Sequence, residues 1–457
     1  MANEKADVVI CGAGIAGVSA AWHLSRAAPW WRIFLVDERP PLSLTSDKST
    51  EGYRDWWPGP DDAMIRLMSR SIDLLEEIAL RSGCRLRLNR RGYLFVSGNT
   101  SRLEEFTRLA ASTAALGAGP LRIHRGAPGD PPYLLSDAPE WQSAPSGADL
   151  LLDPGLIRHH FPFLSPHSAV ALHTRRCGWF SGQQLGMLLL EEARQRGVDL
   201  IRASITAVKS HGGRVEAVRL EGKGGSRWIS TVCFVNAAGP LLGKVGRMVG
   251  VELPVFCELH LKAYLTDMLA VVPRNAPLMI WDDPQSLPWS AEERKVLADD
   301  RRTNFLLEVL PGGAHLRPEG DRTLLLLWPY HLAPVEPAFP LPEDEFFAET
   351  ALRGLVRLVP GLGRYLERLP RIPVDGGYYT NTRENRPLCG PCGPQGSFVL
   401  GALSGFGLMA ALGISELLTA HIAEDALPGY APAFRLERYA DPAYQRLLAN
   451  WGAMAQL

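Results

Sequence analysis

The sequence predicts an α/β protein in which a unit of parallel strands and helices is interrupted by a region built on a mixed or antiparallel sheet. Three observations support this fold class. A glycine-rich turn lies between an apolar strand and a helix near the N-terminus, the middle third changes to longer β-rich runs with prolines, and a strand-and-helix pattern returns toward the C-terminus. With 457 residues, 46% of them apolar, the chain can fill two domains or one large intertwined unit.

The first unit is a strand, a turn, a helix and a second strand. Val8–Ile10 is a short apolar run, and Val18–Ala27 contains good helix formers. Ile33–Val36 is again apolar and ends at Asp37. This order and spacing predict a right-handed crossover between parallel strands.

The next elements follow from hydrophobic periodicity. Asp61–Ser82 carries apolar residues at helical spacing and ends at Gly83, which predicts a long amphipathic helix. Gly117–Gly155 is rich in Pro, Gly, Ser and Asp, so we expect an insertion at the surface there. A second helix is expected over Gln183–Arg196. The strands expected around these elements are Tyr93–Val96, Asp199–Val208, Arg214–Leu220 and Val232–Val235.

The middle third, between Leu259 and Pro370, has a different pattern. Its β-rich runs are interleaved with prolines, which indicates a separate antiparallel sheet. A strand at Val399–Gly401, a glycine-rich turn and a helix at Leu408–Ala423 then return to the first pattern. The β-rich runs of the middle third are Leu259–Leu265, Asn304–Val309 and Leu324–Trp328.

The charges and the cysteines exclude several classes of partner and site. The 48 Lys and Arg nearly cancel the 49 Asp and Glu, so no bulk charge favours nucleic acid or an anionic membrane, and a small molecule is the expected partner. The seven cysteines are odd in number and, apart from Cys389 and Cys392, widely scattered, which indicates reduced thiols in a cytoplasmic protein rather than a disulfide framework, and no metal site is expected. We interpret Cys389 and Cys392 as packed turn thiols rather than a redox pair.

No targeting or membrane-spanning segment is expected. The apolar run within Met1–Cys11 is shorter than that of a signal peptide. The longest apolar stretches, Leu324–Trp328 and Phe406–Leu418, are too short or too interrupted to cross a bilayer. We therefore expect a soluble protein.

A GxGxxG motif lies at the turn of the first unit, between the strand and the helix. Gly12 makes the tight turn, Gly14 lets a pyrophosphate approach the backbone, and Gly17 lets the helix pack closely on the strand. The phosphates would rest on the N–H groups at the start of the helix, at Ile15 and Ala16. In this context the motif predicts dinucleotide binding, without distinguishing NAD from FAD.

An acidic residue after the second strand completes this predicted site. Asp37 is placed to accept hydrogen bonds from the ribose hydroxyls, and Glu38 is the alternative. A carboxylate at this position also disfavours a 2′-phosphate, because the two negative charges repel each other.

Four separated blocks carry a family resemblance. They are CGAGIAGVSAAWHL at Cys11–Leu24, FVNAAG at Phe234–Gly239, YYTNTRENRPLCGP at Tyr378–Pro391 and LGALSGFGLMAALG at Leu400–Gly413. In this order they resemble the D-amino acid oxidase superfamily of flavoproteins, in the branch that contains glycine oxidase, sarcosine oxidase and related amine dehydrogenases. The resemblance implies a glutathione-reductase-like FAD-binding Rossmann domain interrupted by an α+β substrate domain. The implied FAD domain comprises 1–90, 170–255 and 372–430, the substrate domain 91–169 and 256–371, and a helical tail 431–457.

The resemblance also implies which residues approach FAD. The C-terminal glycine turn would offer backbone N–H groups to the flavin, because a helix N-terminus stabilises negative charge on the reduced ring. Ser49 and Thr50 stand where some relatives carry a histidine linked to flavin, and Gly377 stands where others carry a cysteine, so non-covalent FAD is implied. The residues assigned to FAD beyond the first motif are Ser46, Lys48, Ser49, Thr50, Val208, Ala238, Gly239, Gly401, Gly405, Phe406, Gly407, Leu408 and Met409.

The family's carboxylate clamp is only partly present. In our alignment Tyr379 and Met409 replace an arginine of glycine oxidase and a lysine of sarcosine oxidase. Arg54 matches another arginine of sarcosine oxidase, and a guanidinium suits a carboxylate, although a surface or FAD-phosphate role is the alternative. The aromatic residues that could line the substrate site are Trp56, Trp57, Tyr264, Tyr330, Tyr378 and Tyr379.

Two further positions bear on the substrate site and on the electron acceptor. His260, Lys262 and Tyr264 are two residues apart along one expected strand, so their side chains lie on the same face of the sheet. This face either lines the substrate site or faces solvent. Leu326 stands where monomeric sarcosine oxidases place a lysine that promotes reaction with oxygen. This difference leaves room for a dehydrogenase that uses another electron carrier.

Together these features imply an FAD-dependent amine or amino acid oxidase or dehydrogenase. It would oxidise the C–N bond of a glycine-, sarcosine-, proline- or D-amino acid-like substrate to an imine by hydride transfer to flavin. The alternatives are oxidation of a C–O bond or of a larger amine without a carboxylate, and a non-catalytic flavoprotein that acts as an assembly factor. The residues assigned to the chemistry are Arg54, Tyr264, Tyr330 and Tyr379.

Overall fold

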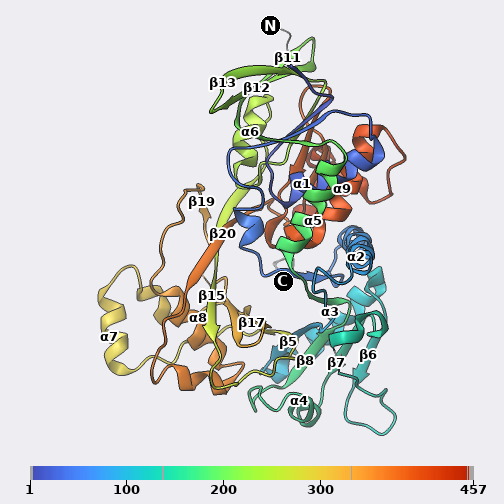
Figure 1. Ribbon diagram of the computed structural model, residues 1–457. Coiled ribbons are helices and arrows are strands. Elements are labelled where there is room, and N and C mark those ends of the chain that lie inside the picture. Colours follow the sequence, from blue (N-terminus) through green and yellow to red (C-terminus); the bar gives the residue numbers. More distant parts are fainter. Residues whose placement is uncertain (1–3, 136–137, 331, 450, 452–457) are drawn as a thin grey trace.

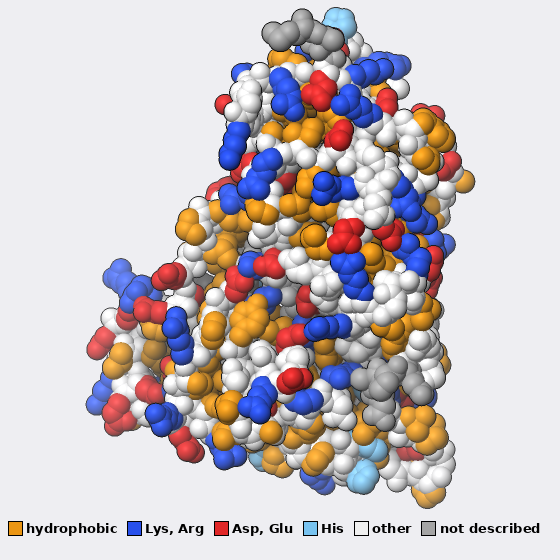
Figure 2. Space-filling view, in the orientation of Figure 1, with side chains coloured by type: hydrophobic (Ala, Val, Ile, Leu, Met, Phe, Trp, Pro, Cys, Tyr) orange, Lys and Arg blue, Asp and Glu red, His pale blue; other side chains and the backbone are white. Residues whose placement is uncertain are grey.

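The computed structural model describes residues 4–135, 138–330, 332–449 and 451. Two large sheets organise the chain, and the long strands β15 (Phe256–Thr266) and β20 (Val374–Asn381) run side by side from the upper to the lower part of the molecule (Figure 1). Acidic and basic side chains are interspersed over the face shown in Figure 2. The predicted α/β class with a second, interrupting sheet is confirmed.

The first large sheet has six strands in the order β10-β3-β2-β14-β22-β21. All neighbouring strands are parallel except β21 and β22. Strands β2 and β14 are buried at every position, as expected for a parallel sheet that is covered on both faces. The strands are β2 (Val8–Cys11), β3 (Ile33–Asp37), β10 (Asp199–Arg202), β14 (Cys233–Asn236), β21 (Leu388–Pro391) and β22 (Ser397–Gly401).

Helices cover one face of this sheet, and a small sheet covers the other. Val8 and Ile10 pack among the helices, whereas Val9 points the opposite way and packs against the small sheet. The helices are α1 (Ile15–Ala27), α2 (Ala63–Arg81), α5 (Gly182–Gln195) and α9 (Gly407–Ala423), three of which, α1, α5 and α9, lie together in Figure 1. The small sheet comprises β1 (Glu4–Lys5), β11 (Ser204–His211), β12 (Arg214–Gly222) and β13 (Gly225–Ser230), with α6 (Leu242–Met248) beside it.

Helix α9 and the turn before it form the most apolar helical stretch of the described chain. Ser404–Ala423 is long and apolar enough to cross a membrane, so the expectation that Phe406–Leu418 is too short does not hold for the whole helix. In the structure 67% of its most apolar window is buried, and the helix packs against α1 and α2. This packing is that of a core helix.

The second large sheet has ten strands, with β20 pairing β15 beside the path β19-β15-β18-β17-β16-β5-β8-β7-β6. Its pairs are antiparallel except β16 with β5 and β6 with β7. Besides β15 and β20 it contains β5 (Tyr93–Ser97), β6 (Leu121–His124), β7 (Ala148–Leu151), β8 (Val170–Thr174), β16 (Leu278–Trp281), β17 (Ala314–Glu319), β18 (Thr323–Leu327) and β19 (Pro334–Val335). The helices packed around it are α3 (Leu103–Thr113), α4 (Pro154–His160), α7 (Ala291–Asp299) and α8 (Phe347–Val356).

Three expectations from the sequence differ from this arrangement. Asn304–Leu307 is a 3-10 helix with Leu306 buried, not a strand, because so short an apolar run has no decisive period. Gly117–Gly155 contains β6 and β7 and is therefore more than a surface insertion. Strands β8 and β20, assigned to the FAD domain by the boundaries at 170 and 372, pair within the ten-stranded sheet.

The C-terminal tail packs back onto the turn between β20 and β21. Glu384, in that turn, is buried and accepts hydrogen bonds from Arg438 at 2.8 Å and from Tyr444 at 2.9 Å. The tail therefore supports a turn whose residues Thr382 and Asn385 reach the large cavity described below. The described elements of the tail are the 3-10 turns Ala431–Phe434 and Leu436–Ala440 and helix α10 (Pro442–Ala449).

The two faces of the ten-stranded sheet have different roles. Residues directly opposite each other on paired strands point to the same face, so the strand register defines rows across the sheet. One row, Ala263, Leu326, Leu316, Met279 and Leu94, is buried in a core with α8. The adjacent row points the opposite way and consists of Lys262, Leu327, His315, Ile280, Phe95 and Leu172.

Candidate active site

Two adjoining cavities lie between the sheets. The small cavity is lined by the glycine turn before α1, the segment 42–46 and the turn before α9. The large cavity, of about 1240 Å³, lies under the second face of the ten-stranded sheet. Tyr379, Ser404 and Gly405 line both cavities, so the cavities meet at these residues.

The glycine turn before α1 fits tightly against the end of β14. Gly12 has φ of 106°, and a Cβ atom there would lie 2.4 Å from the Ala237 carbonyl oxygen. A Cβ atom on Gly17 would lie 1.9 Å from the Gly12 carbonyl oxygen. The turn and helix α1 can therefore come this close only because both positions are glycine. The Ile15 N–H donates to the Ser46 hydroxyl at 2.9 Å, which places a second polar group at the start of α1.

Asp37 holds the same turn from the end of β3. Its carboxylate accepts hydrogen bonds from the Ala13 N–H at 2.7 Å and from the Arg39 N–H at 2.8 Å, and it lines the small cavity. Glu38, the alternative ribose acceptor, instead accepts from the Ser204 hydroxyl at 2.6 Å and lines neither cavity. Of the two acids, the structure therefore places Asp37 at the site.

The opposite end of the small cavity is the turn before α9. Ala402 and Ser404 have φ of 53° and 48°, a left-handed backbone that makes a tight reversal here. A Cβ atom on Gly405 would lie 2.6 Å from the Tyr379 ring, so the turn lies directly against this side chain. Helix α9 begins at Gly407 without a side-chain cap, so its first N–H groups are available to an anionic ligand.

Most predicted cofactor residues come together at these cavities. Thr50, Phe406 and Met409 line the large cavity, beside the small one. The predicted residues that line the small cavity are Gly12, Gly14, Ile15, Ala16, Asp37, Ser46, Ser49, Ala238, Gly239, Gly401, Gly405, Gly407 and Leu408.

Three assigned residues lie elsewhere, in addition to Glu38 and the packing glycine Gly17. Lys48 pairs with Asp47 at 2.7 Å and with Asp375 at 2.8 Å, outside both cavities. Val208 lies on β11 and pairs with Val218 of β12, because β11 belongs to the small sheet and not to the six-stranded sheet. Tyr264 lies on β15 with its ring 5.4 Å from the Lys262 ammonium, outside both cavities.

In the segment Ser49–Glu51, Ser49 lines the small cavity and Thr50 the large one, and two buried cations hold the segment in place. The Lys262 ammonium donates to the Ser49 carbonyl at 2.9 Å, and the Arg317 guanidinium donates to the Thr50 carbonyl at 2.9 Å. Burial lowers the pKa of Lys262, and the nearby Glu51 opposes this shift. The role of Arg317 was not predicted from the sequence, because its partner Thr50 is remote in the chain.

Arg54 is a buried cation that lines the large cavity. Arg54 is 7% exposed, and its guanidinium lies 4.3 Å from the centre of the Trp57 ring. Within the described part of the chain it forms an ion pair with no carboxylate, and its Nε atom is buried without a hydrogen-bond partner. Burial lowers the pKa of Arg54, yet a guanidinium keeps its charge in proteins.

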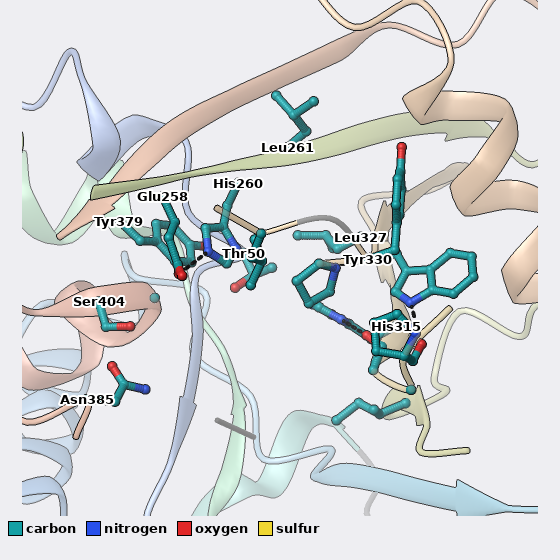
Figure 3. A pocket seen from close by; sticks show the side chains of 18 of the residues that line it. Thr50, Glu258, His260, Leu261, His315, Leu327, Tyr330, Tyr379, Asn385 and Ser404 are labelled. Carbon is teal, nitrogen blue, oxygen red and sulfur yellow. Dashed lines mark hydrogen bonds and ion pairs between the residues drawn. The ribbon is translucent and has the colours of Figure 1, made fainter. Parts of the chain in front are cut away.

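A second polar group lies beside Tyr379 on the wall formed by β15 and β20. The His260 ring stacks on Tyr379 with centroids 3.9 Å apart, and its Nε2 lies 3.4 Å from a Glu258 carboxylate oxygen. The Asn381 amide donates to the same oxygen at 2.7 Å and so fixes the carboxylate. Figure 3 shows Glu258, His260, Tyr379 and Thr50 together, with Tyr330 at the other end of the cavity. Burial raises the pKa of Tyr379 to about 12, so its phenol stays protonated at neutral pH.

Leu326, the position aligned with an oxygen-activating lysine, faces away from the cavities. It belongs to the buried row that packs with α8, whereas Leu327, the next residue, lines the large cavity. A slip of one residue exchanges the two faces of a strand, so the alignment at Leu326 carries no information on the site.

The cysteines are all free in the described residues, and burial raises the pKa of Cys392 to about 11.

Comparison with known proteins agrees with this geometry. The family model named DAO, FAD dependent oxidoreductase, matches residues 7–421. The chain belongs to this family. Solved structures share the fold over almost the whole chain, and L-proline dehydrogenase from P. horikoshii has a TM-score of 0.72 at 17% identity, covering 96% of this chain and 98% of its own. Glycine oxidase from Geobacillus kaustophilus has a TM-score of 0.71 at 16% identity, covering 95% and 99%.

Curated relatives match by sequence over part of the chain. Mitochondrial sarcosine dehydrogenase of Mus musculus is 27% identical over 269 residues, which are 56% of this chain but 25% of that protein. D-amino acid dehydrogenase of Rhizorhabdus wittichii is 26% identical over 306 residues, 59% of this chain and 69% of that protein. The flavoprotein thus spans about a quarter of the length of the sarcosine dehydrogenase that it matches.

The residues present fit FAD. The tight turn at Gly12, the start of α1 and the uncapped start of α9 open on one cavity, and Asp37 also lines it. Two helix N-termini suit the pyrophosphate and the electron-rich end of a flavin. The junction at Tyr379 and Gly405 is where the ring would meet the large cavity.

Proposed function

We propose that this FAD-dependent oxidoreductase oxidises the C–N bond of an amine that carries a carboxylate, such as an α-amino acid or an N-alkyl amino acid. The observation that carries this proposal is that Arg54 is buried at the large cavity and has no counter-ion among the residues that the structure describes. The names of relatives support the same class, since they include a sarcosine dehydrogenase, a D-amino acid dehydrogenase, an L-proline dehydrogenase and a glycine oxidase.

The guanidinium of Arg54 would bind the substrate carboxylate. A buried charge without a partner is unfavourable in the free protein, and a carboxylate with two oxygens matches the paired N–H groups of arginine. Trp57 holds the guanidinium from one side, and Trp57 itself packs edge to face with Phe406 at a centroid distance of 5.0 Å. This contact links the carboxylate site to the start of α9, where the two cavities meet.

His260 is the group placed to accept the proton of the substrate ammonium. When Nε2–H donates to Glu258, the other ring nitrogen, Nδ1, is left as an acceptor. Stacking on Tyr379 holds the ring at the junction of the cavities. Deprotonation matters because only a neutral amine can release hydride from its α-carbon to give an imine.

FAD, when bound, supplies the two-electron acceptor for this oxidation, and water then hydrolyses the imine. The protein residues bind the carboxylate, orient the amine and exclude bulk water from the junction. The FAD is proposed to be non-covalent, because Ser49, Thr50 and Gly377 stand where the relatives with a covalent flavin are expected to carry the linking histidine or cysteine. Release of the yellow chromophore by acid precipitation tests this point.

Anaerobic reduction of the FAD-loaded protein tests the proposed function. Amino acids are mixed with the enzyme alongside hydroxy acids of the same skeleton and amines that lack the carboxylate, and the loss of flavin absorbance is followed. Amino acids should bleach the flavin at lower concentrations than the matched amines. Faster reduction by hydroxy acids would establish C–O oxidation instead, and failure of every compound would favour a non-catalytic flavoprotein. Admission of air afterwards shows whether oxygen or another carrier takes the electrons.

A further inference from the structure

We infer that the natural substrate carries a bulky apolar substituent, aromatic or alkyl, on its amino acid skeleton. This inference rests on the proposed function and concerns a part of the large cavity that glycine, sarcosine or proline would leave unfilled. The cavity has a volume of about 1240 Å³, of which the flavin ring, expected beside Thr50, Gly405 and Phe406, would take one end. A substrate of five or six heavy atoms would use a small fraction of it.

One part of the cavity is apolar on both sides, and we call it the apolar lobe. Its floor is the sheet, where Phe95, Leu172 and Ile280 are direct neighbours in one row across β8, β5 and β16. Its roof includes Phe106 and Leu109, which lie three residues apart on α3. Phe95, Phe106, Leu172 and Ile280 are each 5% to 7% exposed, so they contact one another at the edges and still face the cavity.

The charged groups near the lobe are already paired. The Arg102 guanidinium lies 2.6 Å from Asp282, 3.0 Å from Glu105 and 3.3 Å from Asp283. These side chains therefore satisfy each other and do not call for a charged ligand. Among the arginines of the described chain that line the cavity, Arg54 is the buried one without a carboxylate partner, whereas Arg383 is exposed to solvent, so we place the carboxylate at Arg54 and leave the lobe to an apolar group.

Arg54 also lies next to the lobe, which sets the direction of the substituent. Trp57 contacts the guanidinium at 4.3 Å and belongs to the same apolar cluster as Phe95 and Phe106. Burial raises the pKa of the Tyr93 phenol, and the nearby Arg54 charge opposes this shift, which places the guanidinium close to Tyr93. Tyr93 is two residues from Phe95 on the same face of β5. A carboxylate on Arg54 thus leaves the rest of the substrate between the flavin end and the lobe.

The test uses the FAD-loaded wild-type protein and two ligand series. The first series is acetate, butyrate, phenylacetate and 4-phenylbutyrate, whose binding is read from the shift of the flavin spectrum without any turnover. The second is glycine, alanine, norvaline, norleucine and phenylalanine in both configurations, read by anaerobic bleaching. Each buried CH₂ group should lower the dissociation constant about fourfold. Dissociation constants that do not change along both series would overturn the inference.

A variant in the lobe separates it from the rest of the site. Leu109 is half-buried and lines the cavity, so Leu109→Glu places a carboxylate in the lobe with little risk to the core. It should weaken binding of 4-phenylbutyrate at least tenfold and leave acetate within twofold. Leu80→Glu, at an exposed site on α2 outside both cavities, is the matched control and should change neither.

The two series also distinguish the two ways of failing. If the carboxylates bind with the expected chain-length dependence but no amino acid bleaches the flavin, the lobe is real and the proposed C–N oxidation is wrong. If glycine and sarcosine bleach the flavin as well as norleucine and phenylalanine do, the proposed oxidation stands and the bulky substrate is wrong. An equal effect of Leu109→Glu on acetate and 4-phenylbutyrate would likewise contradict the lobe.

Discussion

Replacing Arg54 by methionine should lower activity and leave the fold as stable as before or more stable. Methionine keeps much of the length of the side chain but removes the guanidinium that faces the cavity. A hydrogen bond to a charged group contributes about 1.5–3 kcal/mol, so kcat/KM for an amino acid should fall roughly 10- to 150-fold. The same kinetic constant for a matched amine without a carboxylate should change little.

The effect on stability follows from the absence of a counter-ion among the described residues. Arg54→Met removes the stacking on Trp57, which is worth about 0.5–2 kcal/mol. It also removes the desolvation penalty of a buried unpaired charge, which is several kcal/mol. The free energy of unfolding should therefore stay constant or rise by about 1 kcal/mol.

A second buried arginine provides the control. Arg175 and Asp149 are both 1% exposed at their side chains and form an ion pair, and Arg122 remains beside Asp149, so Arg175→Met should lower the free energy of unfolding by about 1.5–3 kcal/mol, the contribution of a hydrogen bond to a charged group. Urea unfolding of both FAD-loaded variants measures the contrast. The reasoning is refuted if Arg54→Met destabilises the protein as much as Arg175→Met, or if it slows amino acids and carboxylate-free amines equally.

Three further predictions concern the cofactor turn, the proposed proton acceptor and a buried histidine. Gly12→Ala forces a Cβ atom to within 2.4 Å of the Ala237 carbonyl at φ of 106°, so the bound FAD per protein, read by absorbance, should fall at least tenfold; full occupancy would contradict the close fit. His260→Gln should slow flavin reduction about a hundredfold at neutral pH and much less above the pKa of the substrate ammonium, whereas a loss independent of pH would show a merely structural role. Burial lowers the pKa of His173 well below its usual value, so the folded protein binds fewer protons than the unfolded chain, and the free energy of unfolding should fall as pH drops below about 6.5. His173→Gln should flatten that decline in urea titrations, and an unchanged slope would assign it to other groups.

Local patterns in the sequence were sufficient for the cofactor end of the molecule. Gly12, Gly14 and Asp37 could be placed because the turn, the helix start and the next strand are adjacent in the chain, and their geometry follows from a few neighbouring residues. The four blocks of family resemblance extended this to Gly405 and Leu408. Helix limits were close to those observed, as for α5 at Gly182–Gln195 against the expected 183–196.

Errors arose where a residue's role depends on a partner far away in the chain. Val208 and Tyr264 lie on correctly predicted strands but outside both cavities, since the pairing partners of β11 and β15 decide where each strand runs. Leu326 was one residue away from the cavity-facing Leu327, and only the register with β17 and β15 shows which of the two faces the core.

The sequence by itself determined the fold class, the cofactor turn and the family, because these depend on short-range periodicity and on residues within a few positions of each other. The tertiary structure decided the chemistry of the substrate end. Arg54 is recognisable in the sequence as a cation. Only the positions of all the described carboxylates show that none of them pairs with it. Likewise, the apolar lobe exists because three strands and α3, distant in sequence, bring Phe95, Ile280 and Phe106 to one surface, and burial of that surface drives them together.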